Sequence, residues 1–185
     1  MRKDFGKKPW MYPQPVLIIG TYNEDGSPNA MNAAWGGIYE ADQVVLCLSE
    51  GHKTTANIKN KRAFTVSIAD AAHVKQADYV GIVSANQVPD KLEKAGFHTT
   101  NSAFVDAPLI DELPLALECR LVKVNEDGNI IGEIVNVSAD ESILGEDGMI
   151  DPTKLRAITF DPVHNAYLEL GQKVGNAFCD GAALK

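Results

Sequence analysis

Asn29-Ala30-Met31-Asn32-Ala33-Ala34-Trp35-Gly36-Gly37 is the stretch around which this chain is organised, and Gly51-His52-Lys53-Thr54-Thr55-Ala56-Asn57-Ile58 is its counterpart further along. The first run combines asparagines with small residues, so a flat group can approach the main chain and form hydrogen bonds at its edges. The second run places a lysine and two threonines where a helix is expected to begin, and unpaired backbone N–H groups there favour a phosphate. Together the two runs predict a nucleotide-like cofactor.

Each run also has a purely structural interpretation. Small residues near Asn32 are typical of closely packed strands, and either threonine of the second run can act as a helix N-cap. Lys53 either neutralises a phosphate or is a solvated lysine. His52 either touches the phosphate or is an ordinary loop histidine. Trp35 either stacks near the ring or belongs to the core, and the core is slightly favoured because large aromatic side chains are usually buried.

Working outward, the sequence predicts a hairpin. Residues 15–22 are rich in β-branched side chains and apolar on both faces, which indicates a central strand. Residues 23–28 contain Asp25-Gly26 and form a turn, so the Asn29 run is a second strand rather than a helix. Residues 1–14 are expected to form an irregular N-terminal arm, which contains apolar Trp10-Met11-Tyr12 and lies on the body or on a partner subunit.

The remaining elements favour a barrel. Further strands are expected at 42–49, 62–68, 114–124, 130–138, 155–160 and 166–170, helices at 54–61, 69–80 and 88–95, and a loop at 98–108. Hairpins dominate, and no G-x-G-x-x-G turn joins an early strand to a helix. The pattern therefore predicts an antiparallel β-barrel with helices on its flank, in one domain of residues 1–185.

Composition excludes several classes of protein. The chain has 185 residues and a formal net charge of −8 with no offsetting basic stripe, which argues against a nucleic-acid partner. It has no transmembrane run and no signal-peptide core, so we expect no membrane partner and a cytoplasmic location. The four histidines lack ligand spacing, and no metal site is expected. The three cysteines are widely spaced and are expected to be reduced thiols: Cys47, Cys119 and Cys179. Cys47 is also expected to be chemically inert.

In this order along the chain, the motifs resemble the flavin reductase-like family, the flavoredoxin-like FMN-binding split β-barrel proteins. The resemblance begins with Pro15-Val16, Asp25-Gly26 and the two runs quoted above. It continues through most of the remaining chain, in Phe64, Asp78-Tyr79-Val80-Gly81, Ser84, Lys91, Gly96, Ala107-Pro108-Leu109-Ile110, Leu117-Glu118-Cys119, Gly132-Glu133-Ile134-Val135, Tyr167, Leu170-Gly171 and Val174-Gly175.

The resemblance implies a six-stranded antiparallel split β-barrel, mainly β with flanking helices, and a homodimer with FMN near the dimer interface. The isoalloxazine ring and ribityl chain would lie along Asn29, Ala30, Met31, Asn32, Ala33, Ala34 and Trp35. Main-chain groups would meet the ring edge at Cys47, Leu48 and Ser49, and the phosphate would be surrounded by His52, Lys53, Thr54, Thr55 and Asn57. Two departures are visible: Ala33-Ala34 stands where many relatives have a hydroxyl residue, and Gly36-Gly37 leaves the wall beside the ring open.

We therefore expect an FMN-dependent oxidoreductase that passes electrons from NAD(P)H or a protein donor through FMN, with no catalytic residue assigned. Two alternatives stay open: an FMN electron-transfer protein without its own small-molecule substrate, and a non-catalytic split-barrel binding module. Asp78 and Tyr79 are expected on a helix surface. Glu118 is interpreted either as an exposed-face carboxylate or as a dimer contact.

Overall fold

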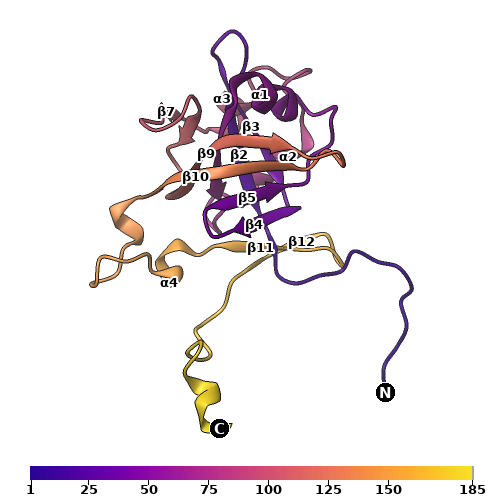
Figure 1. Cartoon of the computed structure of the whole chain (residues 1–185), viewed down its shortest axis with the longest axis vertical. Helices are drawn as coiled ribbons and strands as arrows, with labels where there is room; N and C mark the ends of the chain where they lie inside the picture. The colour runs from indigo at the N-terminus through magenta and orange to yellow at the C-terminus, as the bar shows by residue number, and fades with distance from the viewer. Residues whose placement is uncertain (185) are drawn as a thin grey trace.

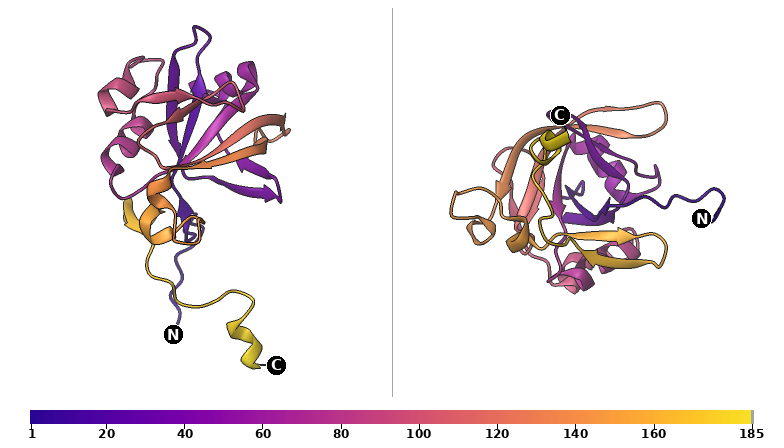
Figure 2. Two further views of the ribbon diagram at one scale, coloured as in Figure 1. Left: turned by 90° about the vertical axis from the view of Figure 1, so that its left-hand side faces the viewer. Right: turned by 90° about the horizontal axis from the view of Figure 1, so that it is seen from below.

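A curled, antiparallel seven-stranded sheet forms the body of the computed structural model, which describes residues 1–184 (Figures 1 and 2). Its strand order is β3-β2-β6-β9-β10-β5-β4. The bounds are β2 (Leu17–Tyr22), β3 (Pro28–Ala33), β4 (Gly36–Glu40), β5 (Gln43–Leu46), β6 (Ala63–Ile68), β9 (Leu115–Val124) and β10 (Ile130–Ala139). The predicted split-barrel class is confirmed, with seven strands in this sheet rather than six.

Shorter elements surround the sheet. A three-stranded sheet joins β1 (Gln14–Pro15), β11 (Ile158–Asp161) and β12 (Ala166–Glu169), and a small hairpin pairs β7 (Thr99–Asn101) with β8 (Pro108–Ile110). The α-helices are α1 (Lys53–Lys61), α2 (Val74–Ile82), α3 (Lys91–Ala95) and α4 (Pro152–Leu155). Two 3-10 turns cover Glu141–Ile143 and Asp180–Leu184. None of the helices between residues 1 and 184 is long and apolar enough to cross a membrane.

The predicted hairpin is confirmed as β2 and β3, which pair from Leu17 opposite Ala33 to Tyr22 opposite Pro28. At its turn Gly26 adopts a φ of +84°, a conformation that glycine reaches without steric cost. The Asp25 carboxylate accepts the Ser27 backbone N–H at 2.9 Å, which closes the turn. β2 lies between β3 and β6, and core clusters cover both of its faces, with Leu17 and Ile19 in one cluster and Ile18 in the other, as its apolar sequence predicts.

The sheet buries a core on each face. One cluster fills the inside of the curl and includes Phe64 of β6 and Ile58 of α1. Gly132 of β10 lets the Phe64 ring lie against the strand, since a Cβ there would stand 2.8 Å from Phe64 Cε1. The second cluster joins the other face to α2 and α3 through Ile18 and Val80, among others. The helices thus cover the flank of the barrel, as predicted.

Several expected boundaries were wrong. The helix expected at 69–80 begins only at Val74. The Asp70 carboxylate accepts a hydrogen bond from the His73 backbone N–H and is also hydrogen-bonded to the His73 ring nitrogen Nδ1. These two bonds hold residues 70–73 in a turn before the helix. The helix expected at 88–95 is the short α3, which ends before Gly96 in the left-handed conformation. The expected loop at 98–108 contains strand β7 and ends at the first residue of strand β8, with which β7 pairs. The formation of these short helices and strands depends on the segments they pack against more than on the pattern of their own residues.

Strand β4 was not predicted, because its two glycines weaken the strand pattern. Gly36 allows the strand to approach β5 closely, since a Cβ on Gly36 would lie 2.8 Å from the Val45 carbonyl oxygen. Gly37 has open space around it. β4 ends the sheet as an edge strand, and its side chains Ile38 and Tyr39 are exposed.

Both chain ends leave the body at the end where β11 and β12 lie (Figures 1 and 2). The N-terminal arm contacts this end of the body at Tyr12, whose hydroxyl donates a hydrogen bond to the Asp161 carboxylate of β11. Further out on the arm, the Phe5 and Trp10 rings meet edge to face with centroids 5.3 Å apart. Tyr12 thus contacts the body, but residues 1–13 of the arm are exposed, so its expected position on the body or on a partner subunit stays a prediction.

Candidate functional site

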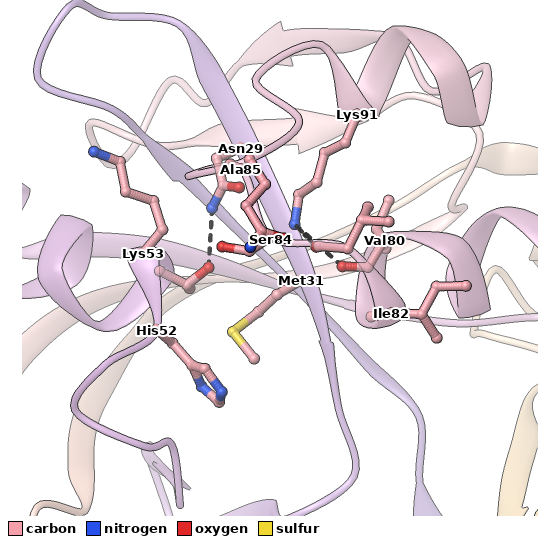
Figure 3. A pocket seen from close by; sticks show the side chains of 13 residues that line it. Asn29, Met31, His52, Lys53, Val80, Ile82, Ser84, Ala85 and Lys91 are labelled. Carbon is pink, nitrogen blue, oxygen red and sulfur yellow. Dashed lines mark hydrogen bonds between the residues drawn. The ribbon is translucent and has the colours of Figure 1, made fainter.

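A cavity of about 240 Å³ lies where the start of α1, the strand β3 and the end of α2 converge (Figure 3). It brings the two runs of the sequence analysis together, because the Asn29 amide donates to the Thr54 hydroxyl at 2.9 Å. His52 and Lys53 form one side, and Val80 and Ile82 form the opposite side. The cavity is lined by Asn29, Met31, His52, Lys53, Thr54, Val80, Gly81, Ile82, Val83, Ser84, Ala85, Gln87 and Lys91.

The start of α1 is built to present donors to this cavity. His52 is the N-cap with extended backbone, and its side chain makes no capping hydrogen bond. The first turn contains no acidic residue. Its backbone N–H groups therefore face outward without a side-chain acceptor, at the positive end of the helix dipole. The N-cap interpretation of the two threonines is wrong, since both lie within the helix.

The Asn29 side chain is 1% exposed and lacks one partner. Its amide nitrogen donates to Thr54 Oγ1 and, at 3.3 Å, to Thr21 Oγ1, whereas its Oδ1 has no hydrogen-bond partner. A buried acceptor without a donor costs about 1–3 kcal/mol. A ligand hydroxyl or N–H group in the cavity would satisfy it, so this atom fits a polyol chain such as that of a flavin nucleotide.

Lys91 supplies a wall of the cavity that sequence reasoning missed. Its ammonium is buried and donates to the carbonyl oxygens of Val80 and Val83, each at 3.1 Å, so it caps the C-terminal end of α2 (Figure 3). Burial lowers the pKa of Lys91 to about 8. An ammonium has three N–H donors, and two are used here, which leaves one for a ligand. In the sequence Lys91 is one charged residue among several in a short helix, which gives no signal of burial.

The cavity is electropositive although the whole chain carries a formal charge of −8. Its lining includes His52, Lys53 and Lys91 and contains no aspartate or glutamate. Cations together with outward-facing helix N–H groups favour an anion such as a phosphate. The segment from Val80 to Gln87, also missed as a lining segment, lies opposite His52 and Lys53 and adds the apolar side chains of Val80, Ile82 and Val83 to the wall (Figure 3).

The other candidate residues lie behind the cavity or beyond it. Asn57 is buried and donates to Thr21 Oγ1 at 3.1 Å, so it supports the threonine that contacts Asn29. Asn32 points to the other face of β3 and donates to the Ala77 carbonyl of α2 at 3.0 Å. Thr55 donates to the Ser49 carbonyl oxygen at 2.8 Å. The small or apolar candidates Ala30, Ala33 and Leu48 are buried in the core.

A second hollow, called here the apolar groove, continues from the end of β3 and has a volume of about 560 Å³. Trp35 lines it and is 56% exposed, so the core interpretation of this residue is wrong. Cys47 lies just after β5 rather than inside it and is exposed. Partial burial and then Asp127 raise the pKa of the Cys47 thiol. The lining residues are Lys8, Pro9, Trp10, Met11, Gln14, Pro15, Ala34, Trp35, Gly36, Gly37, Ile38, Val45 and Cys47.

Two expectations about carboxylates are corrected or refined. Glu118 is neither on the exposed face nor at a surface for a partner, because it is buried and accepts hydrogen bonds from the hydroxyl of Ser102 and, at 2.6 Å, from the amide of Asn136. A bulge in β10 next to Asn136 brings this amide to Glu118. Asp78 on α2 accepts the Tyr167 hydroxyl at 2.8 Å and joins the helix to β12.

Comparison with known families gives a match over most of the chain: the flavin reductase like domain covers residues 10–159. The chain belongs to this family. The flavoredoxin of Desulfovibrio vulgaris (Miyazaki F) is 37% identical and superposes with a TM-score of 0.95 over 98% of this chain and all of its own. The flavoredoxin of Methanosarcina acetivorans is 26% identical, with a TM-score of 0.90 over the full length of both chains.

A more distant relative shares the fold alone. The FMN-binding domain of a flavin reductases-like enzyme from Shewanella baltica OS155 is 20% identical and superposes with a TM-score of 0.77, covering 88% of this chain and 89% of its own. Membership of the flavin reductase-like family supports a flavoprotein oxidoreductase in general. Between residues 1 and 184, no three His, Cys, Asp or Glu side chains are grouped so that they could hold a metal ion.

Proposed function

We propose that this flavin reductase-like protein binds FMN in the cavity between α1, β3 and α2, and passes electrons from NAD(P)H or a protein donor through it. The observation that carries the proposal is the convergence of two lysines, a histidine, a helix N-terminus and the unpaired Asn29 Oδ1 on one cavity without an acidic residue. This combination suits a phosphate joined to a hydroxylated chain.

Different residues of the cavity would bind different parts of the cofactor. The backbone N–H groups at the start of α1, with Lys53 and His52, would bind the phosphate, and Asn29 Oδ1 would accept a ribityl hydroxyl. The ring would continue toward Trp35 and the main chain of residues 47–49, beside the apolar groove. When bound, a flavin supplies one- and two-electron transfer. Lys91 would hold the C-terminal end of α2 through the Val80 and Val83 carbonyls and so keep the apolar wall in position.

The visible spectrum of the purified protein tests this proposal. We expect a flavin spectrum, FMN released on denaturation, and bleaching under argon when NADH or NADPH is added. A protein that stays colourless after addition of FMN would contradict the proposal and favour a non-catalytic binding module.

The likeness to two flavoredoxins supports a second candidate, an FMN electron-transfer protein without its own small-molecule substrate. The same experiment separates the two. Bound FMN that neither coenzyme bleaches, but that dithionite does, would favour this candidate, with a redox protein as the electron donor. The unpaired thiols Cys47, Cys119 and Cys179 support a reducing, cytoplasmic setting for either candidate.

We also propose that the protein is a homodimer. The support is a set of large apolar side chains that stay exposed on the arm and on β3–β4: Trp10, Met11, Tyr12, Trp35, Ile38 and Tyr39. Exposed apolar surface of this kind is typical of a protein interface. Sedimentation equilibrium at micromolar concentration is expected to give twice the chain mass of 20.0 kDa. A stable species of the single chain mass would contradict the homodimer.

A further inference from the structure

The C-terminal tail (residues 171–184) leaves the body beyond β12 and runs away from it (Figures 1 and 2). Its apolar side chains make no contact with their own body: Val174 is 102% exposed, Phe178 109% and Leu184 93%. Only Lys173 and Asp180 are charged within the tail, and their charges cancel. Disordered tails are typically poor in apolar residues and rich in net charge, so this composition does not explain an unattached tail.

The tail has its own local structure. Asp180 accepts the Asn176 backbone N–H at 2.8 Å and the Asn176 amide at 3.2 Å, and the 3-10 turn Asp180–Leu184 follows. Such short elements are marginal in water without packing. A tail that is ordered, apolar and detached from its own body requires another surface to pack against.

The comparison with solved structures points the same way. The Desulfovibrio vulgaris flavoredoxin superposes over 98% of this chain with a TM-score of 0.95, so the match extends into the projecting ends. A superposition that failed over both ends would not reach this score. A segment without contacts to its own body keeps one course in separate proteins only when something outside that body holds it.

The apolar groove offers a surface of matching chemistry. Trp10, Met11, Trp35 and Ile38 line it, and all four side chains are exposed in the single chain. The arm and the tail leave the body at the same end (Figure 1), and Trp10 and Met11 of the arm line the groove. Its volume of about 560 Å³ admits several side chains. The tail in its extended course cannot fill the groove of its own chain, since its apolar side chains are fully exposed.

We infer that the C-terminal tail of one copy docks in the apolar groove of a second copy. In this arrangement the partner's tail covers Trp35 and closes the wall that Gly36 and Gly37 leave open, so each flavin site is completed by the other chain. The inference rests on the homodimer proposed above. It goes further, because it assigns a particular segment to a particular groove.

Two natural cysteines make the inference testable. Cys47 lines the groove and Cys179 lies in the tail, and both are exposed. The remaining thiol, Cys119, is buried, and burial raises its pKa to about 12, so it does not react with maleimides. The variants Cys47→Ser and Cys179→Ser, with different affinity tags, are co-expressed and the mixed dimer is isolated. It is treated with bis-maleimides of two spacer lengths.

In the mixed dimer the only reactive pair is Cys179 of one copy and Cys47 of the other, so any link between them joins two chains. We expect a covalent dimer whose linked peptide joins these two cysteines, and none from the Cys47→Ser, Cys179→Ser double variant. Adding Phe178→Ser and Leu184→Ser to the copy with Cys179 is expected to lower the yield at least tenfold. The matched control Val122→Ser, an exposed residue of β9, is expected to leave it unchanged.

The outcomes distinguish this inference from the proposals on which it rests. A mixed dimer that forms but gives no link with either spacer overturns tail docking and leaves the homodimer standing. Links between two Cys179 residues in the Cys47→Ser homodimer, or an internal link in the wild-type chain, overturn it as well. A monomer in sedimentation overturns both the homodimer and the docking, and the spectrum tests FMN binding separately.

Discussion

Replacing Lys91 by methionine is expected to weaken FMN binding about 10- to 100-fold at pH 7, because a hydrogen bond from a charged donor contributes about 1.5–3 kcal/mol. The ammonium is buried beside the cavity and has one N–H free after it donates to the Val80 and Val83 carbonyls. Methionine has similar length and no donor. Fluorescence titration of the apoprotein with FMN measures the change.

Lys94→Met is the matched control, since Lys94 lies on the same helix but on the surface, where it pairs with Asp90 at 3.0 Å. Exposed pairs contribute little, so FMN affinity is expected to change less than twofold. An equal loss in both variants would show that Lys91 acts only through general charge, and the proposed role at the cavity would be wrong.

The pH profile separates binding by Lys91 from a purely structural role. In the free protein the pKa of Lys91 is about 8, and an anionic ligand beside it raises that value. The protonated lysine binds the anion better, so affinity is present below pH 8 and falls as pH rises through it. We expect the dissociation constant to rise about tenfold between pH 7.5 and 9.5 in the wild type. Lys91→Met is expected to show a flat profile, as the flavin phosphate is already ionised in this range.

Gly20→Ala is expected to destabilise the protein by about 2–4 kcal/mol, the sum of overpacking and one lost hydrogen bond. Gly20 lies in the central strand β2, and a Cβ there would stand 2.8 Å from the Pro108 carbonyl oxygen and closer still to Thr65 Oγ1. These two atoms form a buried hydrogen bond of 2.6 Å that fastens β8 to β6. The added methyl group can be accommodated only if this bond breaks or the strands move apart.

Gly37→Ala is the control, because a Cβ on Gly37 meets nothing within 4 Å. Its free energy of unfolding is expected to change by less than about 0.5 kcal/mol. Urea denaturation of the two variants and the wild type, followed by circular dichroism, provides the comparison. A Gly20→Ala protein as stable as the wild type would show that β2 and β8 are not held as closely as described.

The elements that the sequence predicted well are those whose conformation is determined by residues close together in the chain. The hairpin β2–β3 follows from an Asp-Gly turn between two short strands, and α1 follows from a run that begins at a lysine and ends near Lys61. Each of these signals acts within a few residues. By contrast, β4 was missed, since Gly36 is explained only by the close approach of the Val45 backbone from another strand.

The candidate site divides in the same way. The sequence alone determined the fold class, the hairpin and the two runs that meet at the cavity, because turn chemistry, alternation and helix starts are encoded in neighbouring residues. Only the tertiary structure decided that Lys91 is buried at the cavity, that Trp35 is exposed and that Asn32 faces α2. Burial and facing depend on which distant segments pack together, and a side chain's own neighbours in sequence carry no record of that packing.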